Sequence, residues 1–235
     1  MSKISYFCAT KTQKEMCKNL IIIVLAFMAM PVFSQDIETV DIKNAPDGKF
    51  SITLNDRIIE GNVRNGLREG TWMEYNVGSY LPKQIVSYEK GKKNGVYVEI
   101  DKTGSIVKKA VYKDDRLDGQ VCEWYRGGRL TNMSTYKDGQ LDGEQVVCYE
   151  KGGNLEVSNY KDGQRDGLTT WYYESGQKKM SIEYKNGQFE GKQKTFYPNG
   201  SLKSEANYKG GKLQGKVKTY DEQPTVQSTD EKKKR

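Results

Sequence analysis

Polar and apolar residues alternate in short runs along most of the chain, and turn-forming residues separate the runs. Between Gly119 and Tyr136, residues 120–125 and 130–136 alternate in this way on either side of a glycine-rich turn. Such runs, rich in Tyr, Val, Thr and Trp, are too short for helices and typical of strands. Asp-Gly and Asn-Gly pairs supply the positive φ angles that hairpin turns need. The pattern therefore predicts a succession of β-hairpins.

These predicted hairpins recur with a period of 24 residues. Each unit begins with a tyrosine, and a glycine follows seven positions later. The pairs are Tyr88/Gly95, Tyr112/Gly119, Tyr136/Gly143, Tyr160/Gly167, Tyr184/Gly191 and Tyr208/Gly215. A degenerate unit at residues 63–70 precedes them, one residue out of register. The irregularity in spacing falls at residues 77–82. Because units of such arrays stack on their neighbours, we expect one continuous antiparallel meander.

Alternation along a strand assigns side chains to the two faces of the predicted sheet. Five residues after each unit glycine stand mostly large residues: Ile100, Trp124, Cys148, Tyr172, Phe196 and Tyr220. Two residues before the repeat tyrosine stand mostly small ones, which share its face: Ala110, Ser134, Ser158, Ile182 and Ala206. We expect a thin sheet with an aromatic stripe on one face and polar residues on the other, stabilised by neighbouring units.

The motif Tyr-Lys-(Asp/Asn)-Gly-x-x-(Asp/Glu)-Gly, followed by an aromatic residue, a tyrosine and a further glycine, resembles the bacterial variant of the MORN repeat. The resemblance covers residues 57–221, and the copies recur in phase. It implies an all-β fold, an elongated single-layer antiparallel meander of repeated β-hairpins. It also implies a scaffold for protein or lipid contacts, and some bacterial relatives carry an antitoxin label. Most units lack the tryptophan of the eukaryotic form.

The first 34 residues have the layout of a secretory signal peptide. Lysines precede an apolar run of 14 residues, 20–33, whereas a membrane-spanning helix needs about 20 residues. Cleavage after Ser34 would leave no transmembrane segment; an uncleaved anchor, the alternative, should have a longer apolar run. Residues 16–34 alone form a compact signal peptide, so we hypothesise that translation begins at Met16 rather than Met1.

The predicted organisation has four parts. Residues 1–34 are the signal peptide, and residues 35–56 are a lead-in and N-terminal cap. Residues 57–221 hold the MORN-like hairpin repeats, and residues 222–235 form a polar tail that we expect to be disordered. Strands on either side of Asn55 and Asp56 are expected to form the capping hairpin that a repeat sheet needs.

Composition excludes several kinds of chemistry. The chain has no histidine, which removes Ser-His-Asp and Cys-His catalysis and histidine-ligated metals. Paired aspartates at the turns offer too few oxygens for calcium, and a one-layer sheet offers no cleft for paired catalytic carboxylates. Residues 1–34 hold four lysines and one glutamate, so the net charge of +7 falls to +4 without them. We expect no enzyme activity, no catalytic residue, no cofactor, no metal and no nucleic-acid partner.

Two cysteines remain after the predicted signal peptide, Cys122 and Cys148. They lie on equivalent strands of adjacent hairpins, with a return strand between them. Two strand spacings separate them by about 10 Å, whereas a disulfide needs Cα atoms within about 7 Å. We therefore predict two free thiols that behave as small buried hydrophobes.

A ladder of tyrosines beside one row of turns is the candidate partner-binding surface. Its members stand six residues after each unit glycine: Tyr125, Tyr149, Tyr173 and Tyr197. Tyrosine offers a large contact area with a polar tip, and Trp171 adjoins the ladder in sequence. The other interpretation is that the ladder packs successive hairpins together, and we favour it because the repeat spacing alone accounts for these tyrosines.

The expected function is an exported, non-enzymatic repeat scaffold that binds another protein at the cell envelope, in the periplasm or outside the cell. One alternative is an envelope module for carbohydrate or lipid headgroups, because Trp171-Tyr172-Tyr173 is similar to choline- and glucan-binding repeats. Another, implied by the family label, is an antitoxin or immunity-type partner protein.

Overall fold

The structure, a computed structural model, describes residues 37–224. The predicted signal peptide, the hypothesised start at Met16 and residues 225–235 of the predicted tail lie outside this range. The chain divides into two units after Val40. In the first unit, the described residues are 37–40, with one 3-10 turn, η1 (Ile37–Thr39). The second unit holds the sheet.

One antiparallel sheet contains the seventeen strands of the described chain. They are β1 (Gly48–Leu54), β2 (Arg57–Arg64), β3 (Leu67–Asn76), β4 (Pro82–Glu89), β5 (Lys92–Ile100), β6 (Ile106–Lys113), β7 (Arg116–Leu117), β8 (Gly119–Trp124), β9 (Leu130–Lys137), β10 (Gln140–Cys148), β11 (Asn154–Lys161), β12 (Gln164–Arg165), β13 (Gly167–Tyr172), β14 (Lys178–Lys185), β15 (Gln188–Phe196), β16 (Leu202–Lys209) and β17 (Lys212–Thr219).

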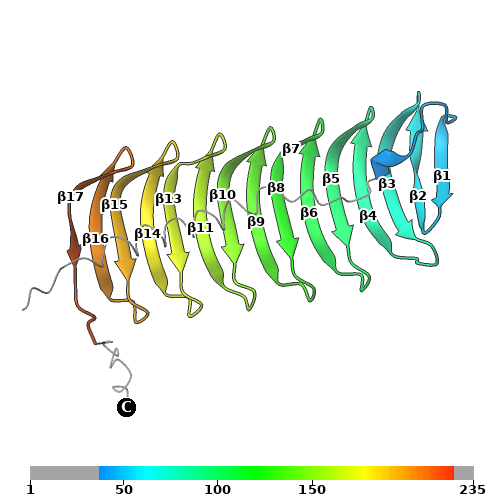
Figure 1. Cartoon of the computed structure of the whole chain (residues 1–235). Helices are drawn as coiled ribbons and strands as arrows, with labels where there is room; N and C mark the ends of the chain where they lie inside the picture. The colour runs from blue at the N-terminus through cyan, green and yellow to red at the C-terminus, as the bar shows by residue number, and fades with distance from the viewer. Residues whose placement is uncertain (1–36, 225–235) are drawn as a thin grey trace, which may run out of the picture. The chain divides into compact units, whose positions relative to one another are not determined.

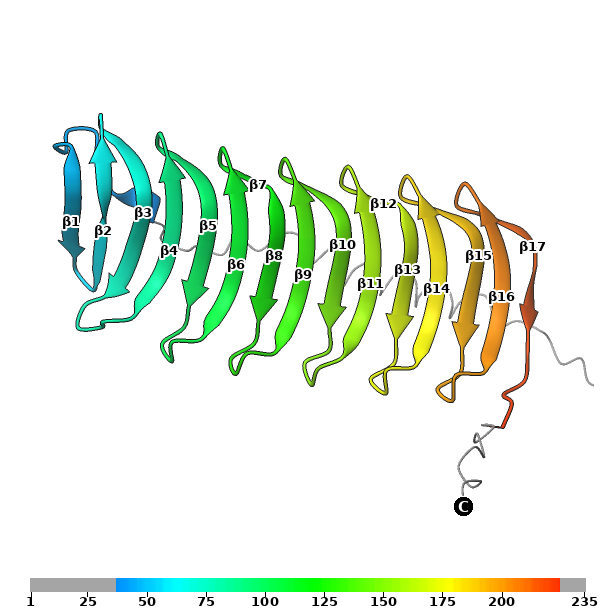
Figure 2. The ribbon, with the colours of Figure 1, turned by 180° about the vertical axis from the view of Figure 1, so that it is seen from behind.

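The strands follow one another across the sheet in chain order (Figures 1 and 2). Each long strand between β1 and β17 pairs with the strand before it and the strand after it, whereas among the described residues β1 pairs with β2 and β17 with β16. Short β7 and β12 are the first residues of strands that continue as β8 and β13. The predicted single-layer meander of hairpins is confirmed. The expected capping hairpin is also present, with Leu54 of β1 opposite Arg57 of β2.

Two rows of turns border the sheet, and each has its own chemistry. The repeat turns carry the Asp-Gly and Asn-Gly pairs; in one of them Asp138 has φ 49° and Gly139 has φ 85°. Two successive positive φ angles define the type I′ turn, whose twist matches that of paired strands. The return turns lie at the other edge. In the one between β10 and β11, two backbone bonds close the turn, from Tyr149 N–H to Gly153 O and from Gly152 N–H to Tyr149 O.

Where an acidic residue precedes the unit glycine, its carboxylate holds the next repeat turn. The backbone N–H of Asp138 donates to the Asp118 carboxylate at 3.3 Å, and that of Gly210 donates to Glu190 at 2.9 Å. A backbone bond runs beside it, from Gly139 N–H to Leu117 O at 2.8 Å. These carboxylates therefore serve turn structure and lateral stacking of the units, which accounts for the acidic position of the motif.

The expectation of one aromatic and one polar face is wrong. Repeat tyrosines do share a face with the small residues, since Gly119 lies opposite Tyr136 and Val121 lies opposite Ser134. We call this face the tyrosine face and the other the reverse face. Trp171 and Tyr172 are neighbours in β13, so their side chains point to opposite faces. Both faces carry aromatic rings because a single layer has no separate interior.

Both cysteines are free, as predicted, but they are half-buried rather than buried. They lie on the reverse face, and residues 37–224 form no second layer over it. Burial raises the pKa of both thiols above 9.0. The neutral form is therefore favoured in the folded chain, and this contribution to stability is present below pH 9.0 and is lost as the pH rises through the folded pKa.

Thiol titration tests this part of the fold. Unreduced, unfolded protein lacking residues 1–34 should show two free thiols. In the folded protein both should react with a maleimide more slowly than after unfolding, because burial lowers the thiolate fraction at pH 8 to 9. The absence of free thiols would contradict the strand assignment of Cys122 and Cys148.

Candidate functional site

Each ladder tyrosine is the first residue of a return turn. Three of the four form hydrogen bonds that join consecutive units. The hydroxyl of Tyr149 donates to Tyr172 O at 2.6 Å, and that of Tyr173 donates to Phe196 O at 2.8 Å. Tyr197 repeats the bond to Tyr220 O at 3.0 Å. Each bond spans 23 residues. The geometry supports the packing interpretation for these three, and their partner-binding role stays a prediction.

Tyr125, the first ladder tyrosine, differs from the others. Its side chain is 43% exposed, and within residues 37–224 its hydroxyl does not make the bond to the next unit. It has the same backbone turn as the others, with Tyr125 N–H bonded to Arg129 O at 2.8 Å. Of the four predicted tyrosines, Tyr125 is therefore the one whose ring is available at the turn edge.

Removing one ladder hydroxyl should separate these two situations. Tyr173→Phe should lower the free energy of unfolding by about 1 kcal/mol, because the Phe196 carbonyl loses its donor. Tyr125→Phe is the matched control and should change stability by less than about 0.5 kcal/mol. Urea unfolding followed by circular dichroism measures both. Equal effects would show that the hydroxyl bonds do not stabilise the stack.

Trp171 lies apart from the ladder, buried on the tyrosine face with 8% exposure. Its indole N–H donates to Glu156 Oε2 at 2.7 Å. Glu156 also accepts hydrogen bonds from Ser158 and from the Arg165 guanidinium. The structure thus does not bring Trp171 together with the tyrosines predicted to share its site.

Arg165 is the centre of this buried cluster. Its guanidinium lies 5.7 Å from the Tyr160 ring centroid, 5.6 Å from that of Trp171 and 5.3 Å from that of Tyr184. Burial by itself disfavours its charge, but Glu156 and the two tyrosine hydroxyls outweigh that effect, so the pKa of Arg165 is raised. Burial also raises the pKa of Tyr184. The cluster is a closed, mutually satisfied set, which indicates a structural role.

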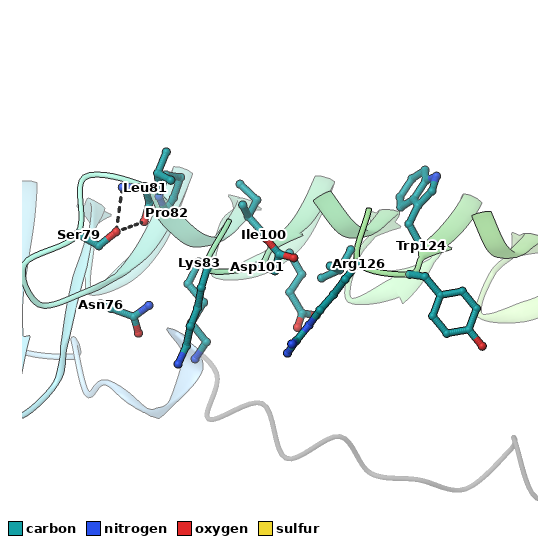
Figure 3. A pocket seen from close by; sticks show the side chains of 13 residues that line it. Asn76, Ser79, Leu81, Pro82, Lys83, Ile100, Asp101, Trp124 and Arg126 are labelled. Atoms are coloured by element: carbon teal, nitrogen blue, oxygen red, sulfur yellow. Dashed lines mark hydrogen bonds between the residues drawn. The ribbon is translucent and has the colours of Figure 1, made fainter. Parts of the chain in front are cut away.

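A hollow of about 480 Å³ opens on the return-turn edge, near the N-terminal end of the sheet. Figure 3 shows Leu81 and Pro82 at one end of it and Trp124 at the other, with Ile100, Asp101 and Arg126 between them. Tyr125 also lines it. We call it the loop-edge hollow. Its walls come from three consecutive turns, those after β3, β5 and β8.

The loop-edge hollow exists because two units depart from the repeat. Asp101 opens its return turn exactly where later units have a ladder tyrosine, with Asp101 N–H bonded to Ser105 O at 2.9 Å. No tyrosine ring therefore extends from this turn toward the next one. The preceding turn is replaced by residues 77–81, the irregularity noted in the sequence, and Leu81 reaches the β5–β6 turn: a Cβ on Gly104 would lie 3.4 Å from Leu81 Cδ1.

Asp101 folds back onto its own turn instead of reaching across the hollow. Its Oδ1 accepts bonds from the Thr103 N–H at 2.8 Å, the Thr103 hydroxyl at 2.6 Å and the Ser105 N–H at 3.1 Å. Hydrogen bonds from Thr103 and Ser105, and then the charge of Arg126, lower the pKa of this carboxyl. Asp101 is therefore ionised at neutral pH, and the bonds of its Oδ1 lie within its own turn.

The irregular loop beside the hollow exposes large apolar side chains. Tyr80 is 99% exposed, and Val77 and Leu81 are each 52% exposed. The Ser79 hydroxyl fixes the loop by accepting from Leu81 N–H at 3.1 Å and donating to Leu81 O at 3.2 Å. From the sequence, this segment was recognised only as an irregularity in the repeat spacing. A run of Val, Tyr and Leu in such an irregular segment was the feature that could have identified it.

Within residues 37–224 no group of three or more cysteine or acidic side chains is placed to hold a metal ion. In the same range no helix is long and apolar enough to span a membrane. The expected absence of enzyme activity and of a cofactor stays a prediction.

Comparison with protein families identifies the repeats at the C-terminal part of the sheet. Residues 165–186 and 189–209 match the model of the MORN repeat variant. The first segment runs from β12 to the turn between β14 and β15, and the second runs from β15 to the end of β16. The comparison with curated proteins gives no match for this chain.

Proposed function

We propose that the sheet of this chain, a MORN-repeat variant protein, is a non-enzymatic scaffold. It binds another protein through the loop-edge hollow. The observation that carries the proposal is the cluster of exposed apolar side chains there. Clusters of exposed aromatic and aliphatic groups with polar rims mark protein-binding surfaces. Here Tyr80 and Leu81 stand beside a pocket with an apolar floor, and Lys102 and Arg126 supply part of its rim.

The occupant that suits the hollow is an apolar side chain of a partner protein. Ile100, Val107 and Trp124 offer it a surface on which it can be desolvated. Tyr80 has only two side-chain torsions, and the Ser79 hydroxyl bonds to the backbone of the loop that carries it, so burying Tyr80 costs less ordering entropy than burying a longer side chain. Trp171, on which the carbohydrate-binding alternative depends, is buried and offers little ring surface to a sugar.

Photo-crosslinking tests this function. A benzophenone amino acid in place of Tyr80 should give one recurrent protein adduct in cells that produce the chain. The adduct should be lost when Leu81→Asp is added, because a charge on the rim of the apolar floor opposes docking. Leu213→Asp is the matched control, since Leu213 is 44% exposed in β17, at the other end of the sheet. Adducts that persist with Leu81→Asp would rule out the hollow as the docking site.

The place of action that we propose is the cell envelope, in the periplasm or outside the cell. The support for this is the sequence of residues 1–34 alone. Fused to an alkaline phosphatase that is active only after export, these residues should give activity and a cleaved product beginning at Gln35. Val24→Arg, which puts a charge in the apolar run, should abolish both. Full activity of that variant would contradict a signal peptide.

A further inference from the structure

The last strand of the sheet has an open edge, far along the repeat from the loop-edge hollow. All eight residues of β17 are exposed, and among residues 37–224 its pairing partner is β16. The equivalent strand of the preceding unit, β15, pairs on both sides, with β14 and with β16. Residues 215–219 therefore present backbone N–H and C=O groups that another strand can pair with.

The reverse face becomes cationic toward this edge. One and three residues after the unit glycine stand Val96 and Val98 in an early unit, but Lys216 and Lys218 in β17. The preceding unit has Lys192 and Lys194 at the same positions. These side chains share one face because they alternate along their strands. The four lysines therefore form a grid on the last two outgoing strands, β15 and β17.

The register between β15 and β16 shows what kind of strand such a grid accepts. Lys194 lies opposite Glu205 and forms an ion pair with it at 3.6 Å. Gln193, on the tyrosine face, lies opposite Ala206. Glu205 also lies opposite Lys218 on its other side. A strand added beyond β17 meets the same pattern, with an acidic residue favoured opposite Lys218 and a small or apolar residue opposite Val217.

The same lysines disfavour a second copy of this chain. Pairing of β17 with another β17 brings two lysine-rich strands together, and like charges on paired strands are destabilising. The other open edge, β1, carries Lys49 and no acidic residue, so it offers no complementary charge. Lysine on an edge strand is a common protection against self-association. Here it leaves one occupant favoured, an acidic strand from a different protein.

We propose that β17 accepts an extended acidic segment of another protein as an added antiparallel strand, in which acidic residues alternate with small or apolar ones. Backbone pairing supplies the affinity, and the lysine grid supplies the selection. This inference concerns a surface separate from the loop-edge hollow and does not rest on it. A variant that blocks one surface therefore leaves the other to be measured.

The probe is an acetylated and amidated peptide, Leu-Thr-Ser-Glu-Ala-Glu-Tyr-Thr, which is a more acidic version of β16. Added at millimolar concentration to isotope-labelled chain, it should shift the NMR amide signals of residues 215–219 and slow their hydrogen exchange. Lys216→Glu with Lys218→Glu should weaken binding about tenfold, since two attractive cross-strand pairs become repulsive. That variant should instead bind the peptide in which both Glu are replaced by Lys.

Lys49→Glu with Lys137→Glu is the matched control, because it makes the same change in net charge on exposed lysines elsewhere in the sheet. It should bind the acidic peptide like the unaltered chain. The proposal is overturned by slow exchange of the residue 215–219 amides in the free chain, because the edge is then already paired. It is equally overturned by shifts centred outside β16 and β17, by equal binding to the charge-reversed variant, or by no saturable binding.

Discussion

Glu156→Ala should lower the free energy of unfolding by about 3 to 5 kcal/mol, the usual cost of removing one partner of a buried ion pair. The Glu156 and Arg165 side chains are 7% and 15% exposed, so little water can take the place of the lost carboxylate. The indole N–H of Trp171 loses its acceptor in the same variant. Urea unfolding followed by Trp fluorescence and circular dichroism gives the value. Glu183→Ala, at an exposed position on the reverse face, is the control and should cost less than about 0.5 kcal/mol.

A second variant distinguishes a buried ion pair from simple loss of packing. Neighbouring units have Met180 at the position of Glu156 and Leu141 at the position of Arg165. Glu156→Met combined with Arg165→Leu removes both charges and keeps their volume, and should come within about 1 to 2 kcal/mol of the unaltered chain. If the double variant were as unstable as Glu156→Ala, the cost would arise from shape and not from the orphaned guanidinium.

Gly61→Ala should destabilise the N-terminal end of the sheet by about 3 kcal/mol, as overpacking of a filled site does. A Cβ on Gly61 would lie 2.2 Å from Trp72 Cδ2, well inside van der Waals contact. The indole cannot easily move, because Trp72 is 0% exposed and its N–H is bonded to Asn62 O at 3.1 Å. Thermal unfolding should show a lower midpoint, and the Trp fluorescence should change at a lower temperature than in the unaltered chain.

The partner experiment for Gly61 is a double-mutant cycle with Trp72→Leu. In the smaller Leu background, the added methyl group has room, so Gly61→Ala should cost little more than its intrinsic propensity. Additive effects of the two substitutions would mean that the ring is not what the glycine accommodates.

Most of the fold could be predicted because each unit contains the residues that specify its own turns and strands. Asp138 and Gly139 specify the repeat turn by their conformational preferences, and the 24-residue spacing specifies which strands are equivalent. The acidic residue before the unit glycine serves the turns in another way, by holding the turn of the next unit. The distribution of aromatic residues was predicted wrongly, since Trp171 and Tyr172 were read as one group although neighbours in a strand face opposite ways.

The candidate site was less predictable because it arises from departures from the repeat. The ladder hydroxyls donate to backbone carbonyls, such as Tyr172 O. Every residue has a backbone carbonyl, so the sequence does not indicate which one accepts the bond. Asp101 in place of a ladder tyrosine leaves the space that becomes the hollow, and only the arrangement of three turns shows it. Arg165 replaces a residue that is leucine in the unit before, and its burial depends on rings from three strands, β11, β13 and β14.

The bonds between units also set an order in which the chain can assemble. The repeat-turn bond from Gly139 to Leu117 and the ladder bond from Tyr149 to Tyr172 each join consecutive units, and every strand pairs with its chain neighbours. A nascent hairpin therefore needs only the hairpin made before it as a template. Starting from the β1–β2 cap, the sheet can grow in step with synthesis, one unit for every 24 residues that leave the ribosome.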